Sequence, residues 1–506
     1  MLFSFLTIVV MILSSSASSS SDESAEMNTA RYFKSIQSNP QKLKPFLFAM
    51  PKGADLHMHA TGATYAEKML DYAAKDNLCI NPETYLVYQE ANCDAQNQLN
   101  EVLKQPDFKQ KLIDSWSMRH FEHDEQPLSH DHFFSTFPKF YFIAKHHPGE
   151  VLGEIAERAA SQNEVYFEVI VTPGGTETRE LGTKLTYNAN FEVMRQQLLS
   201  SGISQILDKV THDLNQDEAS MRQSLACDTQ SPHVGCQIKI GYILRAEREQ
   251  PPEVVFTQLL VGFEAAKHDH RIVGVNIVQP EDGPVSMRDY KLHMQMLGYL
   301  HQLYPDVHMT LHAGELSRAL NIPEDGLRFH IHDAINVAHA DRIGHGVDIT
   351  YENNADGLFS EMAQKHIMVE INLTSNDQVL GIKDSAHPLP LYLSHGVPVS
   401  LSTDDEGVSR TNMTQEYMRA VSSYKLDYLT LKQMSRNSVA YSFLPGTTLW
   451  QDDHYEKPVV ECGNDVLGSS TPSAQCRTFL EMNEKAKLQW VLEGRFIQFE
   501  GSYIRS

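Results

Sequence analysis

The chain has 506 residues, 41% of them hydrophobic, and its 42 basic and 65 acidic residues give a formal net charge of −23. This balance argues against a nucleic-acid-binding protein, because phosphate binding needs a net basic patch. The composition is that of a folded globular protein, and the length suits either about three domains or one barrel enzyme with insertions.

Residues 1–17 resemble a signal peptide. Residues 2–13 are almost continuously apolar, and the Ser/Ala-rich run 14–21 offers small residues for cleavage near Ala17. The basic residues that usually precede such an apolar segment are missing, so an uncleaved membrane anchor or a buried segment stays the alternative. No later stretch is apolar for long enough to cross a bilayer. We predict an exported protein, secreted or periplasmic, with no stable membrane association after cleavage.

Residues 18–50 are predicted to form a helical extension, with a polar, disordered start at 22–26 and one or two short helices over 27–50. The first strand is expected at 54–59. Residues 77–126 are mixed and polar, and they are too irregular for a strand–helix repeat. We therefore predict an insertion there, after the first strand.

From residue 130 onward, apolar runs alternate with helical patterns. The aromatic spacing over 130–146 predicts a buried helix face. The strands expected after it are 165–171, 238–244, 272–278, 308–312, 342–345, 368–372 and 398–403. Helices are expected at 149–162, 252–268, 287–304 and, last, 477–492. With the first strand, the eight alternations predict an α/β fold, a (β/α)8 TIM barrel over 51–450, followed by a C-terminal extension over 451–506.

The six cysteines fall into three pairs that are close in sequence. These are Cys79 with Cys93, Cys227 with Cys236, and Cys462 with Cys476. An even number and short loops suit disulfides in an oxidising compartment, which agrees with export. Six free thiols stay the alternative.

Four polar features follow the predicted strands, at the end of a parallel barrel where enzymes of this fold place their sites. His57 and His59 lie two residues apart on the first strand, so their side chains share one face. The other three features are His312 to Glu315, Gly344 to Gly346, and Ser402 to Asp405. Each feature alone would more often be a helix cap, a solvated turn or a surface loop. Four of them at four strand ends indicate one shared site.

The residue types in this set favour zinc. Three imidazoles and one carboxylate form a nitrogen and oxygen donor set that suits this ion. The donors are His57, His59, His312 and Asp404. Glu315 lies three residues after a predicted ligand, close enough to move a proton near the metal.

These motifs resemble the adenosine deaminase branch of the metal-dependent amidohydrolases. The matching stretches are 50–59 (MPKGADLHMH), 312–315 (HAGE), 342–346 (RIGHG), 373–376 (LTSN), 387–388 (HP), 400–405 (SLSTDD), 436–438 (RNS) and 442–446 (SFLPG). The resemblance covers about residues 45–450. The signal-like start, the insertion and the Cys79/Cys93 pair look more like the secreted subgroup of adenosine deaminase growth factors and adenosine deaminase 2.

The resemblance implies one zinc ion per chain, which activates a water molecule to attack C6 of a 6-aminopurine. The implied ligands are the four donors named above. Glu315 would protonate the ring nitrogen N1, and His345 would orient the water and stabilise its charge. Asp405 would hydrogen-bond the water or the purine N7. Ammonia leaves, and a 6-oxo group replaces the amino group.

The predicted substrate-binding residues are Thr61, Gln279, Asp405 and Trp116, and two of them depart from the pattern that the family commonly shows. Gln279 aligns with a glycine whose backbone meets purine N3, and Pro280 after it lacks a backbone donor. Thr61 stands where many relatives carry an acidic residue that bonds the ribose. An arginine expected near the end of the second strand is missing. Trp116, in the insertion, could touch the ribose, but packing is the more common role of such a residue.

The resemblance thus implies an exported deaminase that converts adenosine or 2′-deoxyadenosine to inosine or 2′-deoxyinosine. The alternatives are a deaminase of adenine or an N6-modified adenosine, and a secreted signalling protein that keeps the barrel without turnover. The implied partners are a small purine nucleoside and, by analogy with the family, a second copy of the chain in a homodimer.

Overall fold

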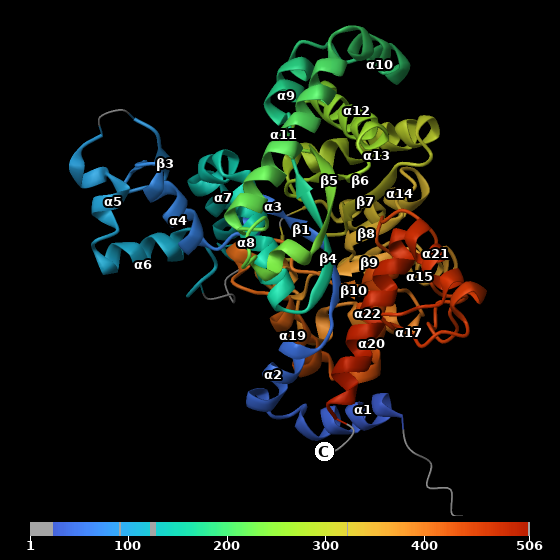
Figure 1. Ribbon diagram of the computed structural model, residues 1–506. Coiled ribbons are helices and arrows are strands. Elements are labelled where there is room, and N and C mark those ends of the chain that lie inside the picture. Colours follow the sequence, from blue (N-terminus) through green and yellow to red (C-terminus); the bar gives the residue numbers. More distant parts are fainter. Residues whose placement is uncertain (1–23, 91–92, 122–127, 321, 504–506) are drawn as a thin grey trace, which may run out of the picture.

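An eight-stranded parallel sheet forms the centre of the computed structural model, which describes residues 24–90, 93–121, 128–320 and 322–503 (Figure 1). The strands are β1 (Gly53–His59), β4 (Glu164–Val171), β5 (Lys239–Glu247), β6 (Ile272–Val278), β7 (His308–Ala313), β8 (Arg342–His345), β9 (Met368–Ile371) and β10 (Val399–Leu401). They are neighbours in chain order. Burial along β1 is continuous, as in strands that are covered on both faces.

The sheet closes into a barrel where its first and last strands meet. The N–H of His59 donates to the carbonyl of Asp404 at 3.1 Å, and the N–H of Asp404 donates to the carbonyl of His57 at 2.9 Å. Met58 and Asp404 form a parallel bridge. Closure therefore brings the histidines of β1 beside the aspartates that follow β10.

Helices cover the outside of this barrel. The main ones are α8 (Pro148–Ser161), α12 (Pro252–His268), α13 (Pro284–Leu303), α14 (His330–Asn336), α15 (Ala355–Gln364), α17 (Leu389–Ser394), α19 (Met413–Tyr424) and α20 (Tyr428–Ala440). α12 packs its apolar face on β5 and β6. Short helices at strand ends are α3 (Ala60–Ala63), α16 (Leu373–Leu380) and α18 (Glu406–Ser409). Two of them start directly after a predicted site residue, α3 after His59 and α18 after Asp405.

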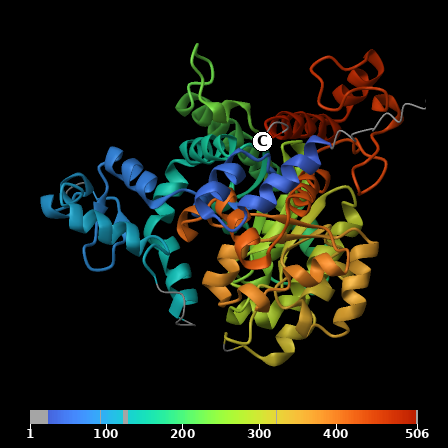
Figure 2. The same ribbon diagram turned by 90° about the horizontal axis from the view of Figure 1, so that it is seen from below.

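One lobe stands beside the barrel in both views (Figure 1, Figure 2). It contains α4 (Ala66–Lys75), β2 (Cys79–Ile80), β3 (Val87–Tyr88), α5 (Leu99–Val102) and α6 (Pro106–Ser115). The lobe returns to the barrel through α7 (Leu128–His146), which contacts α3 and α16. α7 therefore joins the lobe to the rim of the barrel.

Further helices precede β5 and lie at the two ends of the chain. They are α1 (Ala25–Ile36), α2 (Pro40–Ala49), α9 (Gly175–Thr183), α10 (Phe191–Ser200), α11 (Ile203–Ser224), α21 (Ala474–Met482) and α22 (Glu484–Gly501). α1 contacts α20 and α22, so the first and last described helices pack together. Lys432 on α20 donates to Glu26 on α1 at 2.8 Å and to Glu500 on α22 at 2.5 Å.

The eight predicted strands and their order around a parallel barrel are confirmed. Two details are wrong. Ser24 caps α1 and Glu26 lies inside it, so the described part of 22–26 is not disordered. The final helix is two helices, because the backbone at Asn483 is extended and its side chain accepts the N–H of Thr447 at 2.9 Å.

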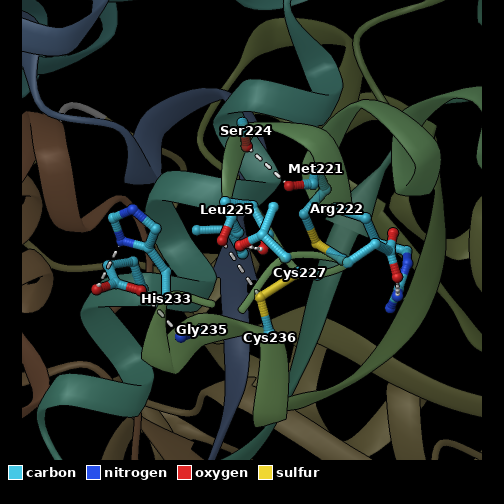
Figure 3. Close-up of a disulfide and its surroundings, with 12 residues drawn as sticks. Met221, Arg222, Ser224, Leu225, Cys227, His233, Gly235 and Cys236 are labelled. Atoms are coloured by element: carbon cyan, nitrogen blue, oxygen red, sulfur yellow. Dashed lines mark hydrogen bonds and ion pairs between the residues drawn. A yellow bond between two sulfur atoms is a disulfide. The ribbon is translucent and has the colours of Figure 1, made fainter. Parts of the chain in front are cut away.

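The three predicted disulfides are confirmed, and the described residues include no free cysteine. Cys227–Cys236 joins the end of α11 to the turn before β5 (Figure 3). In that turn the N–H of Gly235 donates to Glu157 on α8 at 2.9 Å. The bridge therefore lies beside α8, one of the helices that cover the barrel.

Within the ranges that the structure describes, no helix is long and apolar enough to cross a membrane. The predicted signal segment, residues 1–17, lies outside those ranges.

Candidate active site

Three imidazoles and one carboxylate converge at the rim of the barrel. Nε2 of His312 lies 3.1 Å from Nε2 of His57 and 3.1 Å from Nε2 of His59. Oδ1 of Asp404 lies 3.3 Å from Nε2 of His59 and 3.6 Å from Nε2 of His57. All four side chains are buried. The structure thus brings together the four residues that the sequence predicts as metal ligands.

The outer nitrogens of two of these imidazoles have partners that only accept hydrogen bonds. Nδ1 of His57 lies 2.7 Å from the Glu370 carboxylate, and Nδ1 of His312 lies 3.0 Å from Oδ1 of Asn276. That amide oxygen also accepts the N–H of Ile277 at 2.7 Å, which fixes the orientation of the amide. Both histidines therefore carry hydrogen on Nδ1, and their Nε2 lone pairs face each other.

Two lone pairs at 3.1 Å repel unless a positive charge lies between them. Although burial lowers it, hydrogen bonds with Asp404 and Glu370 raise the pKa of His57 to about 10, so a proton on Nε2 of His57 supplies that charge when no metal ion is bound. Burial, together with the neighbouring histidines, lowers the pKa of His312 well below its usual value. The cluster is therefore suited to a cation that is shared by several donors, which is the arrangement of a metal site.

Sequence reasoning did not identify Glu370 and Asn276, the partners of these histidines. Glu370 also accepts hydrogen bonds from Thr310 at 2.7 Å and from Nε of Arg342 at 2.6 Å. Arg342 is buried and donates to Glu168 at 2.5 Å. The sequence did contain a signal for these contacts. Glu168, Arg342 and Glu370 each lie inside an otherwise apolar strand, and a buried charge needs a partner of opposite charge.

A cavity of about 380 Å³ opens beside the cluster. The predicted residues that line it are His59, Thr61, Gln279, His312, Glu315, Asp404 and Asp405. Phe133, Phe134, Phe137, Pro138 and Tyr141 of α7 form an apolar wall. Such a cavity, with an apolar wall and a polar floor, suits a planar, partly polar small molecule.

Glu315 reaches this cavity from the loop after β7. Its N–H and that of Gly314 donate to the Glu281 carboxylate at 2.8 and 3.1 Å. Burial and then the negative charge of Asp404 raise the pKa of Glu315 well above its usual value. This favours a protonated carboxyl group that can donate a proton.

His345, at the end of β8, is fully buried beside the cluster. Its Nε2 lies 4.0 Å from Asp404, and its Nδ1 lies 3.0 Å from the amide nitrogen of Asn376 and 3.7 Å from Glu315. The backbone of His345 has φ +72°, as the turn after β8 requires. Its ring therefore lies between the four predicted metal ligands and Glu315.

Asp405 and Gln279 both line the cavity. Oδ1 of Asp405 is buried with no hydrogen-bond partner among the described residues, and burial raises its pKa well above the usual value. Gln279 has φ +82°, a conformation that favours glycine, and its side-chain oxygen accepts the N–H of Glu249 at 2.9 Å. The Gln279 side chain is therefore held toward the Glu249 backbone.

Trp116 is not among the residues that line this cavity. Its indole N–H donates to the carbonyl of Tyr85 at 3.0 Å, and its ring packs on Phe140 with 6.2 Å between centroids. The structure therefore places Trp116 in the packing of the lobe.

Arg245 and Glu247, at the end of β5, line the cavity and were missed by sequence reasoning. Nε of Arg245 donates to Thr172 at 2.7 Å. The arginine that the family resemblance implies near the end of the second strand is missing, whereas Arg245 lies at the end of the third.

The comparisons with known proteins agree with this geometry. The adenosine deaminase family model matches residues 116–449, more than half of the chain. The chain is 36% identical over 140 residues to an adenosine deaminase of Escherichia coli (strain SMS-3-5 / SECEC), and 30% identical over 178 residues to one of Enterococcus faecalis (strain ATCC 700802 / V583). The matches cover 28% and 35% of this chain and 38% and 48% of those proteins.

The fold has counterparts among solved structures. A zinc-bound amidohydrolase from Burkholderia ambifaria has a TM-score of 0.50 and 16% identity, with 79% of this chain and 88% of that chain covered. The matched family region begins after β1, so the place of His57 and His59 in the site rests on the fold and not on the family match. Taken together, the family match and the folded site lead to one conclusion: the chain belongs to the adenosine deaminase family.

Proposed function

We propose that this protein is a zinc-dependent aminohydrolase that converts adenosine and 2′-deoxyadenosine to inosine and 2′-deoxyinosine with release of ammonia. The observation that carries the proposal is the convergence of His57, His59, His312 and Asp404 beside Glu315, on the floor of a cavity with an aromatic wall. The curated adenosine deaminases support the reaction class, although less than half of their length is matched.

The donor spacing supports zinc. Ligands about 2.0–2.1 Å from a tetrahedral zinc ion lie about 3.3 Å from one another. Four of the six distances among these donor atoms, those that join His312 or Asp404 to His57 and His59, run from 3.1 to 3.6 Å. A bound zinc ion would lower the pKa of a water molecule toward neutrality and so supply a nucleophile at the cavity floor.

The neighbouring side chains supply the remaining proton and hydrogen-bond chemistry. Protonated Glu315 would donate a proton to N1 of the purine, which makes C6 electrophilic. His345 would hydrogen-bond the oxygen that adds at C6, and Asp405 would accept a hydrogen bond from that oxygen's proton or bond N7. The proton of the hydroxyl group added at C6 would pass to N6, so that cleavage of the C6–N6 bond releases NH3 and leaves the 6-oxo purine.

Two alternative substrates would use the same site: adenine, which lacks the sugar, and an N6-modified adenosine. Gln279 bears on this choice because it lines the cavity at the position aligned with a glycine of the family. We favour adenosine because Arg245 and Glu247 add polar groups to the same lining, where a sugar's hydroxyl groups could bond.

We further propose that the chain is exported and belongs to the secreted growth-factor and adenosine deaminase 2 subgroup. Its three disulfides and the lobe between β1 and β4 support this assignment. Expression with the native N-terminus should release the protein outside the cell with the leader removed, as mass spectrometry of the N-terminal peptide would report.

The central test measures ammonia release from adenosine and adenine and methylamine release from N6-methyladenosine, together with the metal content of the same protein. We expect about one zinc per chain and the highest kcat/KM on adenosine. His59→Ala should fold and lose both metal and turnover. Turnover of adenine or the methylated nucleoside with none of adenosine would replace the substrate assignment, and a metal-free active protein would overturn the mechanism.

A further inference from the structure

A chain of hydrogen bonds links a backbone amide to the ring of His345. The N–H of Leu389 donates to Nδ1 of His387 at 3.1 Å. Nε2 of His387 lies 3.0 Å from Oδ1 of Asn376, and the Asn376 amide nitrogen lies 3.0 Å from Nδ1 of His345. His345, Asn376 and His387 are buried, with at most 2% of each exposed.

The first member of this chain fixes the hydrogen positions of the others. A backbone N–H can only donate, so Nδ1 of His387 must accept and carries no hydrogen. The hydrogen of this neutral ring is then on Nε2, which donates to Asn376. An amide oxygen accepts that bond, so the Asn376 amide nitrogen points to His345 and donates to it.

The same reasoning fixes the position of the hydrogen on the His345 ring, beside the four predicted metal ligands. Since Nδ1 of His345 accepts the amide hydrogen, the neutral ring carries its own hydrogen on Nε2. Nε2 has no hydrogen-bond partner among the described residues and lies 4.0 Å from Asp404. The amide nitrogen of Asn372 also lies 3.4 Å from Nδ1, so a second donor group faces that nitrogen.

We propose that Asn376 and His387 are positioning residues that hold the His345 hydrogen on Nε2 and so make His345 a hydrogen-bond donor at the reacting oxygen. The catalytic part of this inference rests on the proposed function. A donor at Nε2 stabilises negative charge on an oxygen that adds at C6, and it cannot accept that oxygen's proton. His345 then assists by charge stabilisation, and Asn376 and His387 act only through it.

Nitrogen-15 NMR of histidine-labelled, zinc-loaded protein tests the tautomer directly. The His345 signal is assigned by its loss in His345→Ala. In the unmodified chain we expect hydrogen on Nε2 and a bare Nδ1. Asn376→Asp replaces the amide donor with a carboxylate acceptor of the same shape, so hydrogen should move to Nδ1. His387→Phe, which removes the donor to Asn376, should give a mixture of both tautomers.

The control is Asn437→Asp, a buried asparagine on α20 that donates to the carbonyl of Val399 at 2.9 Å and lies outside the site. It should lower stability while leaving the His345 spectrum unchanged. For ammonia release from adenosine, we expect Asn376→Asp to lower kcat about a hundredfold with KM within about twofold and zinc content unchanged, a loss comparable to removing one oxyanion donor.

Hydrogen on Nδ1 of His345 in the unmodified chain overturns the inference. So does an Asn376→Asp variant with an unchanged spectrum, or one with a shifted tautomer and normal kcat. If the unmodified chain does not release ammonia, the proposed function fails while the tautomer measurement still decides the hydrogen-bond chain.

Discussion

Glu370 holds the outer nitrogen of His57 from the middle of β9. A metal-ligating histidine binds best when its second nitrogen donates to a carboxylate, because this fixes the ring and raises its basicity. We predict that Glu370→Gln weakens zinc affinity about 10- to 100-fold. Competition with a chromogenic chelator measures the change in the dissociation constant.

Thr310→Val is the matched control for this prediction. It removes the Thr310 hydrogen bond to the other oxygen of Glu370 and leaves the His57 contact in place. Its zinc affinity should stay within about threefold of the original chain. Equal losses in the two variants would mean that the fold around Glu370, rather than its contact with His57, sets the affinity.

Glu281 supports a different residue, Glu315. Its carboxylate accepts the N–H groups of Gly314 and Glu315, and His330 donates to it at 2.6 Å. Gln at this position would face one of those N–H groups with its own N–H₂, so the loop would shift. Since a shift of about 1 Å can cost about a hundredfold in rate, we predict that Glu281→Gln lowers kcat tenfold or more with KM nearly unchanged.

Steady-state kinetics and metal analysis check this result together. Zinc content should not change, because Glu281 contacts none of the four ligand side chains. Glu493→Gln serves for comparison, since Glu493 is a buried carboxylate that accepts two hydrogen bonds from Arg436 at 2.8 Å on the far helices. A similar fall in kcat there would attribute the effect to general loss of stability.

The ligands of the cluster could be predicted from sequence because each lies at a strand end, where side chains of a parallel barrel meet. The partners that orient them could not. Arg342 meets both Glu370 and Glu168 only through the register of β8 and β9 and the closure of the barrel. Trp116 illustrates the same limit, because its contact with Tyr85 depends on how the lobe folds.

At the scale of elements, α7 contributes an aromatic wall whose members have two different roles. Phe137 lines the cavity, whereas Phe140 is 2% exposed and packs on Trp116. We predict that Phe137→Ala raises KM for adenosine about tenfold with little change in melting temperature, because the lost contact of about 1.5 kcal/mol is with substrate.

Phe140→Ala is the counterpart in the same helix. A buried phenylalanine lost from a core costs about 3–5 kcal/mol, so this variant should melt earlier while KM stays unchanged. Calorimetry and initial rates on both variants separate the roles. If Phe137→Ala lowers stability as much as Phe140→Ala and leaves KM alone, α7 does not form the substrate wall.

The strands were predictable because parallel strands buried on both faces appear as short apolar runs. β6 and β8 match their predicted bounds, and α12 spans 252–268 as expected. Helical periodicity predicted one final helix because it continues across Asn483. The break there depends on the contact with Thr447, which is distant in sequence.

At the scale of the molecule, the site exists only when the whole barrel is closed. His57 and His59 come from the first strand, and Asp404 from the turn after the last, joined by two backbone hydrogen bonds. A metal ion that binds these residues therefore links the two edges of the sheet, and its binding energy becomes folding energy.

Removal of the metal should accordingly lower the melting temperature of the entire chain. A free ligand at about a thousand times its dissociation constant stabilises the folded state by about 4 kcal/mol. We expect chelator treatment to reduce the melting temperature by several degrees, and added zinc to restore it. Since His59→Ala lacks one ligand, its lower melting temperature should respond little to chelator. An equal response in both proteins would place the stabilising ion outside the barrel rim.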